Sequence, residues 1–436
     1  MTAAPSPATP PDALAPGAPV PAPSGAPRPT APVGAGFQSS LTFAFFGTWI
    51  ALLPATQVTL ALKVTQIDAE GRAAALSLVL GVGAFVALIA QNIFGALSDR
   101  TTSRFGMRRP WIAAGAILGV SSLFLLASAS TIPMLVVAWA CTQLTFNILL
   151  AGLNPVLPDQ VPSSQLGKVS ALVGMTQSLA AVGGAWFAQL FLPDLTKAIV
   201  IPGILTLVSV GILMVVLRDR TVPRGAAPRF RITTFLGAFW TNPRKAPDFA
   251  LAWWSRFLVF CGNFTLASYQ VYFLMDRFGY DNTAIGGKIL QVTAVTTVCT
   301  IAASLLVGRI SDRLQRRKMF VLISAVVLAV AHGLAAFAGT FEMFLAASAV
   351  AGLAIGVYLA VDSALIAEVL PSRADVGKDM GVLHLANVLP QTLVPVAAPV
   401  VLAIGGGGEN YPALFVAGAI VGIIGAVVNQ FIRSVR

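Results

Sequence analysis

The chain has 436 residues, of which 56% are hydrophobic and 10% are charged, and its mean hydropathy is +0.82. Soluble domains carry about 25% charged residues, so this composition excludes an ordinary soluble domain and indicates a chain that lies mostly in lipid. The net charge of +11 does not indicate a nucleic-acid partner, because the basic residues lie in short loops between apolar segments and not on one solvated face.

Residues 1–36 contain eleven of the 28 prolines and otherwise mainly Ala, Gly, Ser and Thr. A segment of this composition cannot bury enough apolar surface to fold. It also lacks the basic start and the apolar run of a secretory signal. We therefore predict that residues 1–36 form a disordered cytoplasmic tail.

Twelve apolar runs follow, each near the ~20 residues that a membrane-spanning helix needs. They cover 40–62, 73–96, 110–130, 133–157, 169–191, 198–217, 249–274, 285–308, 319–339, 343–367, 380–403 and 412–432. The pattern predicts an all-α membrane protein with twelve transmembrane helices. The longest connection is polar and basic, which divides the chain into a six-helix bundle over 37–217, a cytoplasmic linker over 218–248 and a second six-helix bundle over 249–436.

The positions of Lys and Arg predict the orientation in the membrane. With both termini inside, 22 of the 28 basic residues lie on the inner side, five lie on the outer side and Arg256 lies within an apolar run. We therefore expect a multi-pass protein of the cytoplasmic membrane with both termini in the cytoplasm.

A polar loop rich in arginine interrupts the pattern between the second and third runs. Its sequence over 95–110 is Gly-Ala-Leu-Ser-Asp-Arg-Thr-Thr-Ser-Arg-Phe-Gly-Met-Arg-Arg-Pro, and a shorter copy, Gly-Arg-Ile-Ser-Asp-Arg, starts 213 residues later at position 308. A second repeat places an acid, Pro-Ser and Gly-Lys over 159–168 and again over 368–378. Two motifs repeated in the same order predict two related, pseudo-symmetric halves, which is a known plan of transporters.

The loop over 95–109 resembles the loop between helices 2 and 3 of the major facilitator superfamily, Gly-x-x-x-Asp-Arg-x-Gly-x-Arg-Arg, in a longer form. The longer form is similar to that of the sucrose–proton symporters and of their relatives, the glycoside–pentoside–hexuronide cation symporters. The resemblance implies the major facilitator fold, in which two six-helix bundles give alternating access to a central cavity.

The fourth run departs from the plant sucrose symporters at two positions. Gln143 stands where they carry an acid, and Asn154 stands where they carry an arginine. The Gly-Pro-rich motif of drug–proton antiporters is missing as well, because 174–191 contains two adjacent glycines but no proline. The resemblance thus argues against the drug antiporters, while two functional positions of the sucrose branch have no counterpart here.

The two repeated loops are predicted to form a cytoplasmic gate. A carboxylate there can bond a helix N-terminus or a nearby arginine when the inner side is closed. The alternative is that the basic residues only fix the topology. The predicted gate residues are Gly95, Asp99, Arg100, Arg104, Gly106, Arg108, Arg109, Asp312 and Arg313.

Two ionisable residues lie deep within apolar runs, Arg256 in 249–274 and Asp362 in 343–367. A charge at mid-membrane costs roughly 2.5–3.5 kcal/mol, so such residues are by default assigned a function and a partner. Their similar depth predicts an ion pair in which Asp362 is the proton site, and the alternative is a static structural pair. His384 is the second candidate for proton coupling, because histidine titrates near neutral pH.

Amide and aromatic side chains recur along five of the predicted helices. Amides can make paired hydrogen bonds to vicinal hydroxyls, and aromatic rings can stack on sugar rings. The alternative is that the amides only join helices to one another. The predicted substrate-binding residues are Trp49, Gln57, Gln143, Asn147, Asn154, Trp253, Asn263, Gln270, Tyr358, Asn387 and Gln391.

These observations predict a secondary transporter that moves a hydroxyl-rich solute, such as a sugar, a glycoside or a disaccharide, with proton coupling. The alternative is a major facilitator exporter of a drug-like or other small metabolite. The sequence shows no metal-ligand cluster, no nucleophile–base pair and no Gly-rich nucleotide loop, and its three cysteines lack paired spacing. We therefore expect no enzyme activity, no cofactor, no metal and no nucleic-acid partner, and we expect a monomer in the lipid bilayer.

Overall fold

The structure is a computed structural model that describes residues 30–221, 242–244, 246–314, 317–369, 376–405 and 409–433. The fold is all-α, and twelve helices of the described part are long and apolar enough to cross a membrane. The predicted number of spans is therefore confirmed. Several helices run about a turn or more beyond their apolar runs, because the polar residues at the ends of those runs continue the helix.

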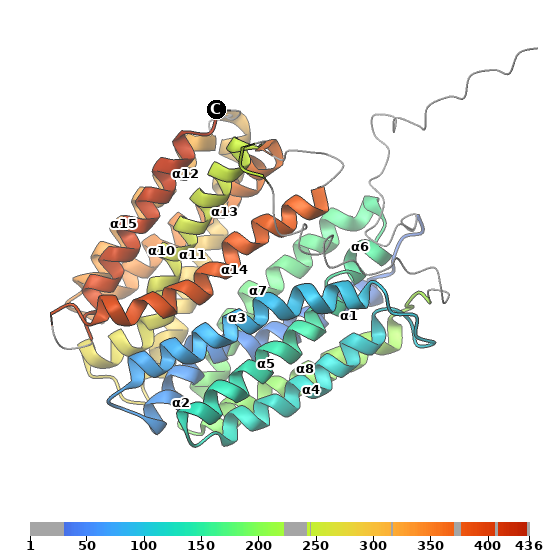
Figure 1. Cartoon of the computed structure of the whole chain (residues 1–436), viewed down its shortest axis with the longest axis horizontal. Coiled ribbons are helices and arrows are strands. Elements are labelled where there is room, and N and C mark those ends of the chain that lie inside the picture. Colours follow the sequence, from blue (N-terminus) through green and yellow to red (C-terminus); the bar gives the residue numbers. More distant parts are fainter. Residues whose placement is uncertain are drawn as a thin grey trace, which may run out of the picture.

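The first half of the described chain, residues 30–221, holds six spans (Figure 1). The first span is interrupted: a π-helical turn follows Pro54, which has no N–H to continue the α-helical bonding, and the Leu60 N–H bonds to the Ala55 carbonyl. The elements are α1 (Ala35–Pro54), η1 (Ala55–Thr59), α2 (Leu60–Ile67), α3 (Arg72–Ser98), α4 (Arg109–Ser128), α5 (Ile132–Leu153), α6 (Val156–Gln160), α7 (Ser163–Phe191) and α8 (Leu195–Val216).

The second half, residues 246–433, holds the other six spans. They are α10 (Pro247–Phe278), α11 (Ile285–Leu314), α12 (Arg317–Ala336), α13 (Phe341–Val369), α14 (Val376–Leu402) and α15 (Tyr411–Gln430). The predicted division at 218–248 stays a prediction, because 222–241 and 245 lie outside the described residues.

Short polar residues and glycine define several helix ends. Thr131, Asp194 and Asn410 each precede a helix, and each side chain accepts a hydrogen bond from the backbone N–H three residues later. Gly279 ends α10 with a φ of 69°, a left-handed conformation that favours glycine.

Close packing within the second half depends on small residues. Gly352 and Gly356 on α13 lie against α11, where a Cβ would come within 2.5 Å of the Thr296 carbonyl and 2.3 Å of the Thr300 carbonyl. The Thr300 hydroxyl donates to the Gly352 carbonyl at 3.0 Å. This small-xxx-small contact joins helices without large side chains between them.

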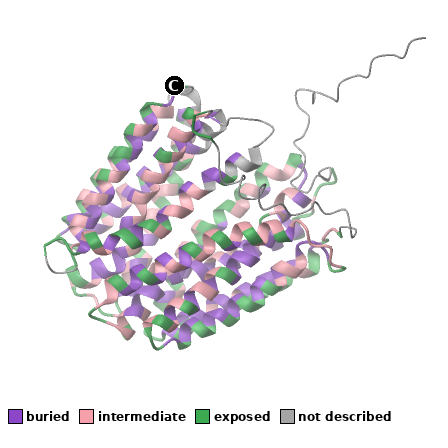
Figure 2. Ribbon diagram, viewed as in Figure 1, coloured by how far each residue is buried: buried purple, intermediate pink, exposed green. Residues whose placement is uncertain are grey.

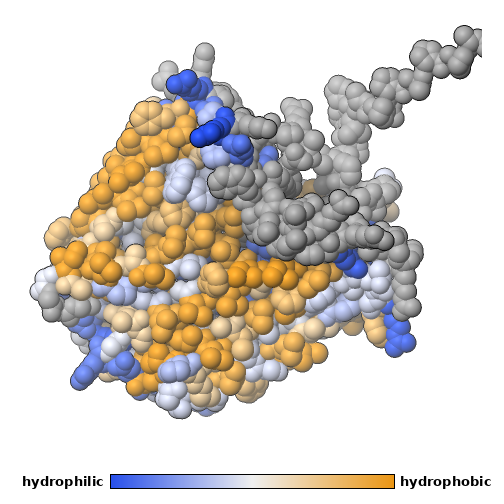
Figure 3. Space-filling model, viewed as in Figure 1, coloured by the Kyte–Doolittle hydropathy of each residue, from blue (hydrophilic) through white to orange (hydrophobic). Residues whose placement is uncertain are grey.

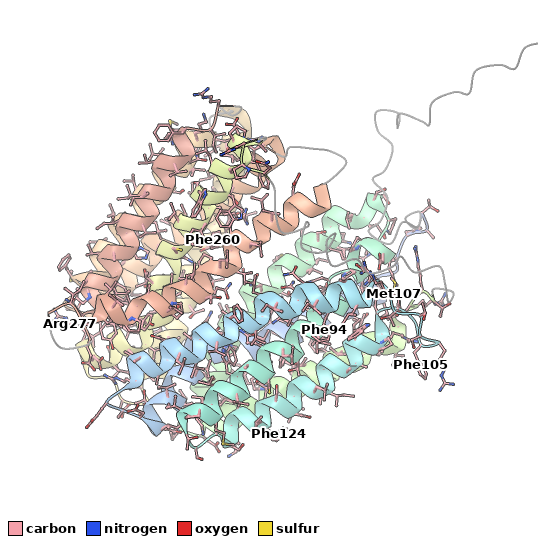
Figure 4. All side chains as sticks on the ribbon, in the orientation of Figure 1. Phe94, Phe105, Met107, Phe124, Phe260 and Arg277 are labelled. Carbon is pink, nitrogen blue, oxygen red and sulfur yellow. The ribbon has the colours of Figure 1, made fainter. Side chains whose placement is uncertain are left out.

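The two halves pack most extensively along two helix pairs, α3 with α14 and α7 with α11, and α10 also contacts η1 of the first half. The ribbons lie together near α2 and diverge towards α6 and the C-terminus (Figure 1). We call the end that carries the 99–108 loop the loop end and the opposite end the far end. Met107 and Phe105 lie at the loop end and Arg277 lies at the far end (Figure 4).

The outer faces of the spans are apolar. Exposed positions lie mainly on the outside of the helices (Figure 2), and hydrophobic side chains cover much of that face (Figure 3). Val215, Leu305 and Val400 are among the exposed large hydrophobic residues. The hydrocarbon of a bilayer accepts such a surface, because the helices satisfy their own backbone groups.

The predicted tail over 1–36 extends two residues too far, because α1 begins at Ala35. The chain is also held before that helix: the Val33 N–H donates to Gln165 Oε1 at 2.8 Å, and Gln165 Nε2 donates to the Val33 carbonyl at 3.3 Å. Residues 1–29 lie outside the described residues.

Candidate functional site

The predicted ion pair between Arg256 and Asp362 is present, and it joins α10 to α13. A second donor acts on the other carboxylate oxygen: the Tyr358 hydroxyl lies 3.0 Å from Asp362 Oδ1. Arg256 Nε donates to Asn387 Oδ1 of α14 at 2.6 Å. Three helices of the second half thus converge on one network, in which the Arg256 side chain is 15% exposed and that of Asp362 is 9% exposed.

Aromatic rings surround this network. The Arg256 guanidinium lies 5.6 Å from the centre of the Phe260 ring, and the Phe260 and Tyr358 rings meet edge to face at 5.9 Å. Figure 4 places Phe260 within the second half, between the helix ends. One turn before Arg256, the Trp253 indole N–H donates to the Val382 carbonyl of α14 at 2.8 Å. The rings limit the access of water to the charges, which strengthens the pair.

A cavity of about 200 Å³ lies farther along α10 and is bordered by both halves. Its polar side chains are amides and hydroxyls, and the Gln57 Oε1 atom is buried there without a hydrogen-bond partner. A buried acceptor of this kind can take a donor from a ligand. The lining residues are Gln57, Ala181, Asn263, Leu266, Ala267, Gln270, Val292, Thr293, Thr296, Thr297, Ser348, Ala351 and Ile355.

The structure divides the predicted substrate-binding residues into three groups. Gln57, Asn263 and Gln270 line the cavity. Trp253, Tyr358 and Asn387 belong to the charged network described above. The other five lie outside the cavity lining and are Trp49, Gln143, Asn147, Asn154 and Gln391.

Local bonding explains much of this third group. Asn147 Nδ2 donates to the Gln143 carbonyl one turn back at 2.7 Å, and Gln391 Nε2 donates in the same way to the Asn387 carbonyl at 3.4 Å. Trp49 packs against the hydrophobic core, and Asn154 is exposed. The side chain of His384 lies outside the described part, so its predicted role stays a prediction.

The loop between α3 and α4 is organised around Arg108, whose side chain is 1% exposed. Its guanidinium bonds to Asp99 Oδ1 at 2.6 Å, to Asp159 Oδ2 at 3.1 Å and to Ser98 Oγ at 2.9 Å. The role as a gate stays a prediction, because all of these partners belong to the first half, but the predicted bond between a loop carboxylate and a nearby arginine is present. It also joins the two repeated motifs of the first half, because Asp159 begins the second motif.

Asp219 holds the same loop from the other side. Its Oδ2 atom accepts the backbone N–H groups of Arg108 at 2.6 Å and of Arg109 at 2.8 Å, at the start of α4. Gly106 has a φ of 108°, and a Cβ there would lie 2.3 Å from Asp219 Oδ2. Sequence reasoning missed Asp219, because a single acid in a basic linker gives no signal for a partner 110 residues away.

The remaining predicted gate residues that the structure describes lie outside the Arg108 cluster, and of them Arg109 reaches another helix, α8. Arg100 Nη1 donates to the Ala96 carbonyl at 2.5 Å, and the Arg109 guanidinium donates to the Met214 carbonyl. The exposed Arg104 lies over the neighbouring Phe105 ring at 4.7 Å. A side chain added at Gly95 would meet open space. The side chains of Asp312 and Arg313 lie outside the described part, so the second copy of the gate stays a prediction.

Comparison with known proteins identifies the family. Residues 35–297 and 253–436 match the Major Facilitator Superfamily. Two proteins of Schizosaccharomyces pombe are 30% identical to short segments of the chain. An uncharacterized MFS-type transporter matches over 128 residues, which are 29% of this chain and 28% of that protein. A general alpha-glucoside permease matches over 97 residues, which are 22% of this chain and 18% of that protein. The matched segments thus span less than a third of either relative.

Solved structures share the fold at low sequence identity. The nucleoside transporter NupG superposes with a TM-score of 0.71 at 14% identity, covering 92% of this chain and 99% of its own. A bacterial homolog of the human lysosomal transporter Spinster, in an inward-facing and unoccupied conformation, superposes with a TM-score of 0.71 at 15% identity, covering 91% and 97%. The chain belongs to the Major Facilitator Superfamily, and it is a multi-pass membrane transporter and not an enzyme.

Proposed function

We propose that this transporter moves a small, uncharged, hydroxyl-rich solute of the sugar or glycoside class and that protons drive the movement through Asp362. The observation that carries the proposal is the separation of two environments along α10. Neutral amides and hydroxyls line the cavity, and the Arg256–Asp362 network lies next to it. Asn263 is two turns from Arg256, about 10 Å at 1.5 Å per residue.

The cavity lining favours a sugar. Amides and hydroxyls can both donate and accept hydrogen bonds, as vicinal hydroxyls do. None of the described lining residues is aromatic, so the lining offers a stacking surface neither to a nucleoside base nor to a sugar ring, and the preference for a sugar rests on the hydrogen-bonding groups. The similarity to the alpha-glucoside permease supports the same class. With about 200 Å³, the cavity is smaller than the roughly 300–1,000 Å³ pockets of drug-sized ligands, which favours one sugar ring over a disaccharide.

The proposed proton role of Asp362 rests on the positive charge that balances its carboxylate. In the present conformation Arg256 balances the charge of Asp362 across two helices. Both helices belong to the second half, so the pair breaks only if α10 also shifts against α13 while the halves move. Such a shift would leave a buried carboxylate without its counter-charge, and a buried unpaired charge is avoided by neutralisation. Making and breaking this pair during the transport cycle would bind and release one proton.

We also propose the orientation. The basic residues favour a cytoplasmic loop end and an outer far end in the cytoplasmic membrane. The ribbons diverge towards the loop end (Figure 1), and the similar Spinster homolog was solved in an inward-facing conformation. The present conformation would therefore face the cytoplasm.

Transport by purified protein in proteoliposomes tests the proposal. Counterflow of radiolabelled monosaccharides, disaccharides and nucleosides identifies the class of solute, and uptake with and without a pH gradient tests the coupling. We expect Asp362→Asn to retain counterflow but to lose uphill uptake, whereas Asp281→Asn, in an exposed far-end loop, should behave as the parent. Full pH-driven uptake by Asp362→Asn would refute the proton role, and counterflow of nucleosides alone would refute the sugar class.

A further inference from the structure

The far end contains an ion cluster that crosses between the two halves. Arg72 is the first residue of α3, and its guanidinium pairs with Asp276 of α10 and, at 3.1 Å, with Glu409 before α15. The cation belongs to the first half and both carboxylates belong to the second. The Arg72 side chain is only 14% exposed, so its position is well defined by these partners.

Helix electrostatics do not explain where these charges lie. A helix N-terminus disfavours a cation and a helix C-terminus disfavours an anion. Arg72 nevertheless starts α3, and Asp276 lies in the last turn of α10, which ends at Phe278. Each residue is at the wrong end for its own helix, and each is compensated by the other across the boundary between the halves.

A buried layer lies beneath the ion cluster. The Tyr272 hydroxyl donates to the Ala61 carbonyl of α2 at 3.0 Å, and the Tyr269 hydroxyl lies 2.6 Å from Ser77 Oγ of α3. Both tyrosines come from α10 and are buried. The Arg72 guanidinium also lies 5.2 Å from the centre of the Tyr272 ring. Charged and neutral contacts therefore join the same two surfaces.

We propose that Arg72, Asp276 and Glu409 form an ionic latch that closes the far end and opens once in each transport cycle. Tyr269 and Tyr272 would form its buried part. The inference rests on the alternating-access function proposed above, because α3 and α10 must separate at this end to admit solute from that side. One guanidinium pairs with two carboxylates, so removing Arg72 leaves two like charges on one half and no ionic attraction to the other, with only the tyrosine hydrogen bonds remaining.

Accessibility of a single cysteine measures the state of the latch. In a background without Cys141, Cys261 and Cys299, a cysteine in place of Ala267 reports on the cavity, because Ala267 lines it. A membrane-impermeant thiol reagent is applied to one face of oriented vesicles and then to the other. Cysteines in place of Glu70 at the far end and Arg104 at the loop end establish which face is which, independently of transport.

We expect Arg72→Gln to raise labelling of the Ala267→Cys reporter from the Glu70 face by about tenfold or more, because a charge-assisted contact is lost, and to lower labelling from the Arg104 face. Arg277→Gln is the matched control: it removes the same charge at the same end, but the Arg277 side chain bonds to Ala338 of its own half. The double variant Arg72→Asp with Asp276→Arg exchanges the two charges and should restore the labelling rates of the parent.

A static structural role gives different results. If Arg72→Gln leaves both labelling rates unchanged, or changes both in the same direction as partial unfolding would, the latch is refuted. Failure of the proposed sugar or proton role would appear in the transport assay and would not affect this labelling. If the protein lies in the membrane the other way round, the Glu70 and Arg104 control cysteines show it. The labelling from the Glu70 face still reports on the far end, because that face is identified by its own cysteine.

Discussion

The two oxygens of the Asp362 carboxylate have different partners, and only one partner belongs to another helix. Arg256 comes from α10, whereas Tyr358 lies one turn before Asp362 on α13. Relative movement of the helices would break the first contact and keep the second. Tyr358 would therefore hold the carboxylate in place after the ion pair breaks.

Replacement of Tyr358 by Phe tests this orienting role. The ring can keep its edge-to-face contact with Phe260, while the 3.0 Å hydrogen bond to Asp362 is lost. Hydrogen bonds to charged groups contribute about 1.5–3 kcal/mol, so we expect pH-driven uptake to fall by about tenfold while counterflow stays near the parent rate. Tyr280→Phe at the far end is the control. An equal loss of both activities would indicate a packing role only.

Arg108 is predicted to dominate the stability of the first half at the loop end. Arg108→Ala would remove the main counter-charge of the buried Asp159 and leave only the weaker interaction with Arg220. Loss of one partner of a buried pair costs about 3–5 kcal/mol, so the melting temperature in detergent should fall clearly. The double variant Arg108→Ala with Asp159→Asn should recover part of the loss. If the single variant melts like the parent, the network does not stabilise the fold.

At the scale of elements, small residues decide which helices can approach one another. Gly352 and Gly356 form one face of α13, and the backbone of α11 passes directly over them. The same face of α11 continues to Thr293 and Thr296, which line the cavity. The packing of this helix pair therefore also positions part of the proposed solute site.

Substitution of Gly356 by Leu should separate α11 from α13. A Cβ at position 356 would lie 2.3 Å from the Thr300 carbonyl, so the backbone of α11 or α13 must move. Overpacking costs typically about 1–3 kcal/mol, and we expect a lower melting temperature together with weaker solute binding. Gly333→Leu on α12, where a Cβ meets open space, is the control. If the melting temperature falls while the affinity for solute stays unchanged, the packing of α11 against α13 does not position the solute site.

At the scale of the whole molecule, the sequence predicts the membrane-spanning helices and the charges within them. It does not predict which side chains from distant helices meet in the tertiary fold. Twelve apolar runs become twelve spans because lipid requires each of them. Arg256 and Asp362 could be paired in advance because charges are rare there. The threonines of the cavity were missed because such residues also occur as ordinary helix-packing groups. Asn154 was expected in the cavity lining but lies outside it, because helical spacing does not reveal which face of a helix is exposed.

A disulfide between α3 and α14 tests whether the two halves must separate on the far-end side during transport. A Cβ at Gly81 of α3 would lie 3.2 Å from Val396 Cγ2 of α14, so the two positions face each other across the boundary between the halves. In the cysteine-free background, oxidation of the pair Gly81→Cys and Val396→Cys should abolish transport, and a reductant should restore it. The control pair Leu123→Cys and Gly203→Cys joins α4 to α8 within the first half. Undiminished transport by the oxidised Gly81–Val396 pair would rule out any opening at the far end, whereas loss of transport in both pairs would place the motion inside the halves.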